Sequence, residues 1–449
     1  MPEAYRIRGR RAAEIAAAIE TAVAAGTMSP GSSLPTLRAL AAELGVNPNT
    51  VGLAYRLLRE RGVIETAGRR GSRVLHRPAH TPRHQIPLHL PPGARDLSHG
   101  NPAASQLPSL REALLRVADE TAREPLLYGL PAEDKRLVDL ALDQYLSDGL
   151  PPGPIAVTSG ALDAIERVLQ ARLRPGDLVA VEDPAWSNLL DLLPALGLRT
   201  VGVAVDNDGP RPGDAARALA SGVTAFVVTS RWQNPTGAAI GAQRAVELRR
   251  LLAARPDVLL IEDDIGHGLA DTPYHPLCMQ DGCPVTEHWA VVRSVAKLFG
   301  PDLRLAVLTG DAETVNRVRG RQRLGSGWVS HVLQRAVVHL WASEAVDRPR
   351  VSAFYAERRE PLIRALAERG VRAYGRTGLN VWIPVPDETS AVVALIQRGW
   401  GAAPGARFRS GARVGLRLTV STLCPEDIPV LAADVAAALR PDLDASRPA

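Results

Sequence analysis

The chain has 449 residues, 46% of them hydrophobic and 22% charged, which is typical of a globular protein but too long for one ordinary core, so two or three domains are expected. It contains no run of about 18 uncharged apolar residues, and its basic N-terminus lacks a continuous apolar core, which argues against a membrane span and a secretion signal. The three cysteines suggest no disulfide framework, and we expect a cytoplasmic protein.

The positive charge is concentrated at the N-terminus. Residues 1–77 hold twelve arginines and six acidic residues, a net charge of +6, whereas the whole chain carries +5. A small basic module is therefore joined to a nearly neutral body. This asymmetry favours a polyanion as the partner of the first domain, although a basic surface without a partner explains the charge equally well.

Residues 1–76 show the pattern of a winged helix-turn-helix domain. Apolar residues recur at helical spacing over residues 11–25, 34–45 and 47–62. Residues 63–75 then predict two short strands around a turn rich in glycine and arginine. In a winged helix-turn-helix domain, the third helix enters the major groove of double-stranded DNA.

Polar residues at the start of the third helix are candidates for reading DNA. Asn47, Asn49 and Thr50 begin that helix, where side chains meet base edges, and either asparagine could also cap it. Arg38, on the preceding helix, could reach a base or a phosphate. Arginines of the hairpin could contact the DNA backbone or the minor groove, although plain solvated charge is an alternative for each arginine. These hairpin arginines are Arg69, Arg70 and Arg73.

The remainder of the chain predicts an α/β fold. Residues 77–95 contain five prolines and are expected to form an extended linker. Between residues 96 and 345, apolar strands alternate with amphipathic helices, which indicates a mostly parallel sheet. Residues 346–449 predict a smaller C-terminal α+β subdomain. The expected strands are residues 155–159, 178–183, 225–230, 258–264, 289–295 and 304–310 in the large domain, and 379–385 and 414–422 in the small one.

Lysine is nearly absent from this chain. Only Lys135 and Lys297 occur, beside 51 arginines. Arginine can replace lysine as a surface charge, but its guanidinium stays protonated and forms no Schiff base with an aldehyde. Lys135 lies in a charged, exposed helical pattern. Lys297 follows an apolar strand and is therefore the candidate nucleophilic amine.

Other polar residues follow the predicted strands, at the sheet edge where ligands of α/β folds gather. The turn Ser159–Gly160–Ala161 could aim backbone N–H groups at an anion. Asp263 ends another strand, although solvated loop acids are common at such positions. Asn234 precedes a Pro-Thr-Gly turn, and Ser294 lies three residues before Lys297.

Taken in chain order, these segments resemble the fold-type-I pyridoxal-phosphate enzymes of the aminotransferase class I/II family, over roughly residues 100–440. The resemblance implies that Lys297 forms an internal aldimine with pyridoxal 5′-phosphate. Asp263 would pair with the pyridine nitrogen and keep it protonated. Asn234 would donate to the 3′ oxygen of the ring, and Trp186 would stack on its face.

The same resemblance implies sites for the phosphate and for a ligand carboxylate. Tyr128 would reach the phosphate of the neighbouring subunit, so a homodimer is expected. Arg417 would bind a ligand carboxylate through both guanidinium nitrogens. The residues implied to hold the phosphate within one chain are Ser159, Gly160, Ala161, Ser294 and Arg304.

The first domain is similar to the GntR winged-helix family. A GntR domain joined to an aminotransferase-like body is the architecture of the MocR-type regulators, which this chain resembles in both halves. The resemblance implies a transcriptional regulator that binds double-stranded DNA and senses a small molecule through Lys297. An amino acid, an amine or pyridoxal phosphate itself is the expected effector, whose differential binding would change the affinity for DNA.

Ile265 departs from the family pattern. Many relatives carry a tyrosine two residues after the aspartate, and its loss removes one donor to the ring oxygen. We therefore expect little or no transamination. The rival hypothesis is an active aminotransferase with an accessory DNA-binding domain. His267 could supply a polar group near the ring, but a structural histidine is the favoured interpretation.

Two other motifs are weighed and disfavoured. Ser294 and Lys297 also match the Ser-x-x-Lys spacing of serine acyl-transfer enzymes, but the further partner motifs are missing from the sequence. Four histidines and cysteines could supply zinc ligands, yet their spacing is irregular and we expect no metal site. These are His275, Cys278, Cys283 and His288.

Overall fold

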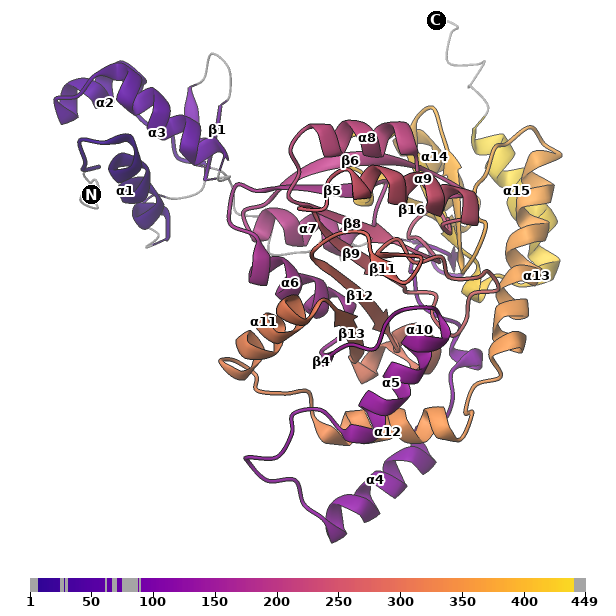
Figure 1. The fold of residues 1–449 in the computed structure, drawn as a ribbon. Coiled ribbons are helices and arrows are strands. Elements are labelled where there is room, and N and C mark those ends of the chain that lie inside the picture. Colours follow the sequence, from indigo (N-terminus) through magenta and orange to yellow (C-terminus); the bar gives the residue numbers. More distant parts are fainter. Residues whose placement is uncertain are drawn as a thin grey trace, which may run out of the picture.

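The computed structural model describes residues 7–24, 28, 31–60, 63–66, 71–74, 88 and 90–439. Two units follow each other along the chain (Figure 1). The first contains three helices and a hairpin, and the second contains a large sheet covered by helices, with a smaller C-terminal unit. No helix among the described residues is long and apolar enough to cross a bilayer.

The N-terminal unit has the predicted winged-helix order. Its elements are α1 (Ala12–Ala24), α2 (Leu37–Leu44), α3 (Pro48–Glu60), β1 (Ile64–Thr66) and β2 (Ser72–Val74). Helix α3 contributes the predicted apolar face, since Val51, Ala54, Tyr55 and Leu58 are buried. The spacing of Leu37, Leu40, Ala41 and Leu44 predicts one apolar face for α2, but Leu37 is 41% exposed. Strands β1 and β2 pair in antiparallel register.

The large domain is built on a sheet with the strand order β4-β13-β12-β9-β8-β5-β6-β7. Its strands are β4 (Ile155–Thr158), β5 (Leu178–Asp183), β6 (Arg199–Asp206), β7 (Gly209–Pro210), β8 (Ala225–Thr229), β9 (Leu259–Asp263), β12 (Trp289–Ser294) and β13 (Ala306–Gly310). All six strands expected from the sequence form. Strands β6, β5, β8, β9 and β12 pair in parallel, whereas β13 runs antiparallel to both β12 and β4.

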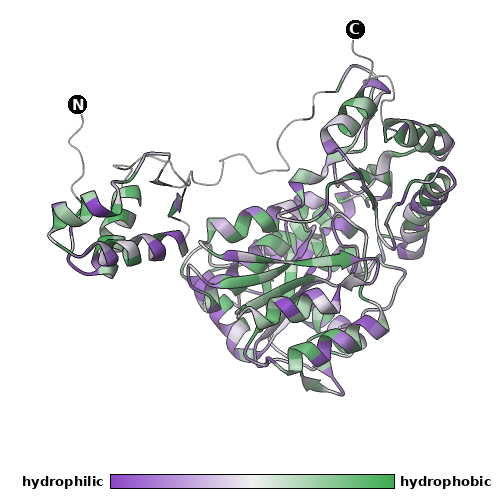
Figure 2. Cartoon of the chain, turned by 90° about the horizontal axis from the view of Figure 1, so that it is seen from above, coloured by the Kyte–Doolittle hydropathy of each residue, from purple (hydrophilic) through white to green (hydrophobic). Residues whose placement is uncertain are grey.

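Helices cover both faces of this sheet. Alternate residues of each strand face opposite sides, so Ala180 belongs to one buried cluster and Val179 and Val181 to the other. Helices α5, α8 and α9 pack on the first face, and α6, α7 and α11 on the second. The apolar strands between these layers are visible in Figure 2. The helices of this domain are α4 (Arg111–Arg123), α5 (Lys135–Ser147), α6 (Ala161–Arg172), α7 (Ser187–Ala195), α8 (Pro212–Ala220), α9 (Ala242–Ala253), α10 (Ala296–Phe299), α11 (Ala312–Arg323) and α12 (His331–Ala342).

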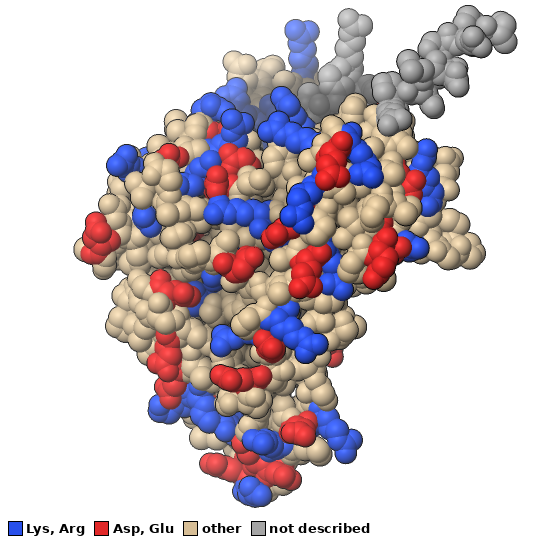
Figure 3. Space-filling view, turned by 90° about the vertical axis from the view of Figure 1, so that its right-hand side faces the viewer, with Lys and Arg blue, Asp and Glu red and all other residues tan. Residues whose placement is uncertain are grey.

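The C-terminal unit packs a small sheet against helices. Strand β14 (Asn380–Pro384) pairs with β17 (Gly415–Thr419), which pairs in turn with β16 (Ala403–Pro404). A separate short pair joins β3 (Arg95–Asp96) to β15 (Trp400–Gly401), so the last residue of the predicted linker already belongs to a strand. The helices are α13 (Arg348–Ala367), α14 (Glu388–Gln397) and α15 (Ile428–Ala438). Basic and acidic side chains are interspersed over the face in Figure 3.

Candidate functional site

A cavity of about 270 Å³ lies between the carboxyl ends of the large-sheet strands and the C-terminal unit. Its wall includes Lys297 and Arg304 from the large domain and Arg407 and Arg417 from the small one, so it is strongly cationic. Of the residues predicted from the sequence, seven line it. These are Ala161, Trp186, Asn234, Ser294, Lys297, Arg304 and Arg417.

The amine of Lys297 faces this cavity. Residue 297 is in α10, directly after β12, and its Nζ donates to the carbonyl oxygen of Gly100 at 2.5 Å. Burial lowers the pKa of Lys297 to about 8, with a further contribution from the positive charge of Arg417. A lysine amine therefore loses its proton at a pH where ordinary lysines stay charged, which is what condensation with an aldehyde requires.

Condensation of Lys297 with an aldehyde should accelerate as the pH rises through about 8. The uncharged amine is the nucleophile, and its fraction grows until the pH passes the pKa. Replacing Arg417 by methionine removes one nearby positive charge, so we expect the midpoint of this profile to move to higher pH. Stopped-flow absorbance of the apoprotein mixed with pyridoxal phosphate measures it, and an unchanged midpoint would show that Arg417 does not act on the amine.

Asp263 provides a buried acceptor without a partner. It ends β9, is 4% exposed, and its Oδ1 has no hydrogen-bond donor among the described residues. Burial raises the pKa of Asp263 to about 7, and the neighbouring charge of Asp264 adds to the effect. Asp263 is two residues after Ile261 on the same strand, so both side chains face the side of the sheet on which Ala161 packs. Asp263 does not form part of the cavity wall. A protonated ring nitrogen would satisfy this carboxylate.

The predicted phosphate turn precedes α6. Gly160 adopts a φ of 102°, and a Cβ there would come within 2.9 Å of Nη2 of Arg304. Only glycine permits this approach, which brings a guanidinium to the helix N-terminus. The Ser159 N–H already donates to Asp163, whereas the Ser159 carbonyl accepts from Arg304 at 3.2 Å. A phosphate would therefore displace part of this arrangement.

Arg417 and Asn234 are in contact. Nη1 of Arg417 donates to Oδ1 of Asn234 at 3.0 Å, and Nη2 donates to the carbonyl of Ser98. Nε of Arg417 is buried without an acceptor among the described residues, and burial, with the nearby Arg407, lowers the pKa of Arg417 to about 9. Such a guanidinium gains from an incoming carboxylate. Ile265 also lines the cavity and offers only hydrocarbon.

Tyr128 does not line the cavity of its own chain. Its side chain belongs to the segment between α4 and α5, is 92% exposed, and contacts Trp328 edge to face at 5.7 Å. Contact between Tyr128 and the phosphate of a neighbouring subunit therefore stays a prediction.

The residues predicted to read DNA lie at or beside the surface of α2 and α3. Arg38, Asn47 and Asn49 are exposed and Thr50 is half-buried. Oδ1 of Asn47 accepts from the N–H of Asn49 at 2.8 Å, so Asn47 caps α3, and the Asn49 side chain is exposed. Arg73 lies half-buried on β2, and Arg69 and Arg70 lie outside the described residues.

A buried ion-pair network lies beside the site, and the sequence reasoning missed it. Asp264 accepts from Arg231 through both oxygens, at 2.9 and 2.7 Å, and from Arg293 at 3.1 Å; Arg293 also pairs with Asp148. Burial alone would raise the pKa of Asp264, but the two arginines lower it. Arg231 follows β8 and Arg293 is in β12, so the network ties the strands on either side of Asp263.

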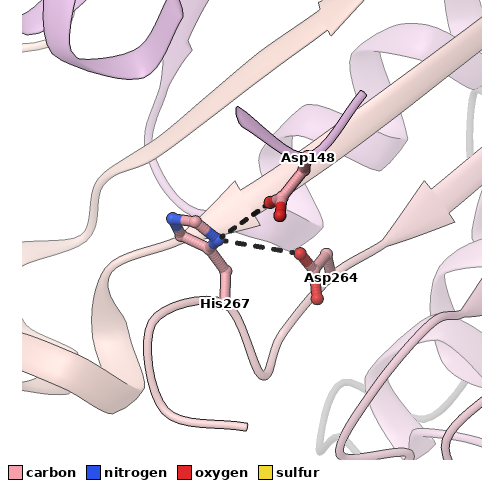
Figure 4. Close-up of side chains that lie close together, drawn as sticks. All are labelled: Asp148, Asp264 and His267. Carbon is pink, nitrogen blue, oxygen red and sulfur yellow. Dashed lines mark ion pairs between the residues drawn. The ribbon is translucent and has the colours of Figure 1, made fainter. Parts of the chain in front are cut away.

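His267 belongs to this network (Figure 4). Its Nδ1 lies 4.0 Å from Asp148 and 3.8 Å from Asp264, and its Nε2 lies 2.8 Å from Gln144. Burial and Arg293 lower the pKa of His267 to about 3, so the ring is neutral. The trio Asp148, Asp264 and His267 could hold a metal ion by geometry, but the arginines already neutralise both carboxylates. His267 is structural rather than part of the cavity wall.

The proposed zinc ligands have other surroundings. Cys278 is buried and its N–H donates to Glu262, whereas Cys283 is exposed on the hairpin of β10 (Met279–Gln280) and β11 (Cys283–Pro284). His288 lies 3.1 Å from Arg172.

Family models match both parts of the chain. Residues 94–435 match the aminotransferase class I and II family, and residues 11–74 match the bacterial regulatory proteins of the gntR family. The chain is 39% identical to the vitamin B6 salvage pathway transcriptional repressor PtsJ of Salmonella typhimurium, over 96% of this chain and 99% of that protein. This chain belongs to the MocR-type transcriptional regulators.

Other relatives agree with this assignment. The regulator TauR of Rhodobacter capsulatus is 27% identical over 93% of this chain and 94% of its own. Kynurenine aminotransferase of Pyrococcus horikoshii shares the fold, with a TM-score of 0.69 at 20% identity over 78% of this chain and 92% of that one. The MocR-type chain thus carries a DNA-binding domain on a fold-type-I body. Pyridoxal phosphate is the cofactor of that body, and the free amine, the unpartnered carboxylate and the glycine turn beside Arg304 fit it.

Proposed function

We propose that this protein is a transcriptional repressor whose effector is pyridoxal 5′-phosphate. The observation that carries the proposal is the presence of Lys297 on the cavity wall and of Asp263 at the end of β9, the strand next to β12. Lys297 supplies an amine that loses its proton near pH 8, and Asp263 supplies a buried oxygen that has no donor among the described residues. The similarity to a vitamin B6 salvage repressor over nearly the whole chain supports the choice of effector.

The cavity favours sensing over turnover. In many relatives, a tyrosine at the position of Ile265 donates a hydrogen bond to the ring oxygen of the cofactor. Ile265 lines the cavity and has no donor, so this hydrogen bond is lost. Asn234 also shares its oxygen with Arg417. The rival hypothesis, a working aminotransferase, predicts many turnovers per site with an amino donor and a keto acid. The repressor predicts less than one turnover per site.

Pyridoxal phosphate should change the affinity for DNA by at least about tenfold, a coupling in the usual range for two linked sites. A specific duplex can be selected with the protein from a random pool, and its binding measured with and without pyridoxal phosphate. Pyridoxamine phosphate, which has no aldehyde, is the matched control ligand. Equal affinities with and without pyridoxal phosphate would refute the proposal.

The protein is expected to act as a homodimer. Large exposed apolar side chains come from α4, from the segment between α4 and α5, and from the segment between α11 and α12. They are Leu115, Leu127, Tyr128, Leu130, Leu324 and Trp328. A second copy would cover them and bring Tyr128 to its partner's phosphate site, as the family resemblance implies. Sedimentation equilibrium of wild type and Trp328→Glu tests this, and a monomeric wild type would contradict it.

Substitutions in the DNA-binding domain should separate base contacts from phosphate contacts. Arg38→Ala and Asn49→Ala are each expected to cost about 1–3 kcal/mol of specific binding, whereas Arg70→Ala should reduce the salt slope by about one. Fluorescence anisotropy at several salt concentrations measures both quantities. If all three variants bind like wild type, the recognition surface is misplaced.

A further inference from the structure

The segment that enters the body from the DNA-binding domain crosses the cavity. We call residues 95–101 the strap. Its first part is fixed to the C-terminal unit, because β3 pairs with β15 and the N–H of Thr419 donates to the carbonyl of Leu97 at 2.8 Å. Only residues 75–94 separate the strap from β2 of the winged helix. The strap is therefore the part of the body that follows the DNA-binding domain most closely in the chain.

Two cationic side chains of the cavity, Lys297 and Arg417, bind the second part of the strap. Nζ of Lys297 donates to the Gly100 carbonyl at 2.5 Å, and Nη2 of Arg417 donates to the Ser98 carbonyl. Gly100 packs so closely that a Cβ would lie 3.2 Å from Nη1 of Arg417. The Gly100 carbonyl thus contacts the nitrogen that an aldehyde would react with. The Ser98 carbonyl contacts the guanidinium that a ligand carboxylate would bind.

Ligand binding is incompatible with the first of these contacts. When Nζ of Lys297 condenses with an aldehyde, a C=N bond forms and the carbonyl oxygen leaves as water with two hydrogens from the nitrogen. The nitrogen keeps at most one hydrogen and no longer has the three donors of an ammonium group. A ligand carboxylate on Arg417 would likewise compete with the Ser98 carbonyl.

We propose that the strap reports the state of Lys297 to the DNA-binding domain: the free amine holds the Gly100 carbonyl, and condensation with pyridoxal phosphate releases it. This inference rests on the proposed function and states how the same site regulates DNA binding. The contact is charge-assisted and half-buried, so its loss changes the free energy of the segment that it holds.

Two lysine variants separate holding from condensation. Lys297→Arg keeps a cationic donor but forms no Schiff base, so it should hold the strap and bind DNA like ligand-free wild type, with or without pyridoxal phosphate. Lys297→Ala has neither property. It should bind DNA like pyridoxal-phosphate-loaded wild type even when no ligand is present.

Hydrogen exchange of the strap gives a readout independent of DNA. In the full-length protein, the peptide covering residues 95–103 should exchange about tenfold faster after pyridoxal phosphate is added, as expected for loss of one hydrogen bond to a charged group. Lys297→Ala should exchange at the faster rate without ligand, and Lys297→Arg at the slower rate with it. Gly100→Ala, which crowds Arg417, should also exchange faster, whereas the exposed Ala104→Ser should match wild type.

The outcomes distinguish this inference from the proposed function. If wild-type DNA binding does not respond to pyridoxal phosphate, the proposed function fails. If wild type responds but Lys297→Ala and Lys297→Arg bind DNA alike and show equal exchange, the strap contact transmits nothing and the inference is overturned. A Gly100→Ala variant with wild-type exchange would count against it in the same way.

Discussion

Replacing Asp264 by alanine is expected to destabilise the protein by about 3–5 kcal/mol, the usual cost of removing one partner from a buried ion pair. Arg231 and Arg293 are 7% and 1% exposed, and both donate to this carboxylate. Its loss leaves two guanidinium groups buried with fewer acceptors. Urea unfolding followed by circular dichroism, without cofactor, gives the free energy of unfolding.

An exposed ion pair serves as the control for this prediction. Lys135 and Asp139 are one helical turn apart on α5, with side chains 86% and 55% exposed. Asp139→Ala should change the free energy of unfolding by less than about 0.5 kcal/mol, because solvent screens such a pair. Similar values for the two variants would show that the buried network contributes no special stability.

Replacing Asp263 by alanine is expected to weaken the binding of pyridoxal phosphate by about 10- to 100-fold, the range for one lost hydrogen bond to a charged group. The wild-type carboxylate has a buried oxygen without a donor, so the ring nitrogen supplies its missing partner. In the alanine variant, that nitrogen would lie in a buried site with no counter-charge. Equilibrium titration followed by absorbance measures the affinity.

Asp143→Ala is the matched control for Asp263, since it removes a carboxylate from the exposed face of α5. It should bind pyridoxal phosphate like wild type. An Asp263→Ala variant with the same affinity as this control would remove Asp263 from the cofactor site.

The strands could be predicted from the sequence for physical reasons that the structure makes clear. Apolar runs such as residues 178–183 and 289–294 form strands because a parallel sheet is buried on both faces. Lys297 was identifiable because arginine had replaced almost every other lysine. Leu37 shows the limit of periodicity, because spacing defines a face but not whether a neighbour covers it.

Two parts of the site left weaker signals. Arg231 and Arg293 stand beside or within apolar strands, and a charge at such a position requires a partner, so the network was detectable in principle. Each arginine is far in sequence from its carboxylate partner: Arg231 from Asp264, and Arg293 from Asp148. The spacing of these residues therefore does not indicate that they pair. The strap was beyond sequence reasoning, because its contacts use backbone carbonyls of Ser98 and Gly100, which any residue could supply.

The most direct test of the account is the visible spectrum of the protein with pyridoxal phosphate, followed by borohydride reduction and peptide mapping. With Lys135 the only other lysine, the modified side chain can be assigned without ambiguity. We predict a visible band in wild type and in Lys135→Arg, no band in Lys297→Arg, and a single modified peptide containing Lys297. A band that survives in Lys297→Arg, or modification at Lys135 instead, would contradict the central claim that Lys297 is the amine that captures the ligand.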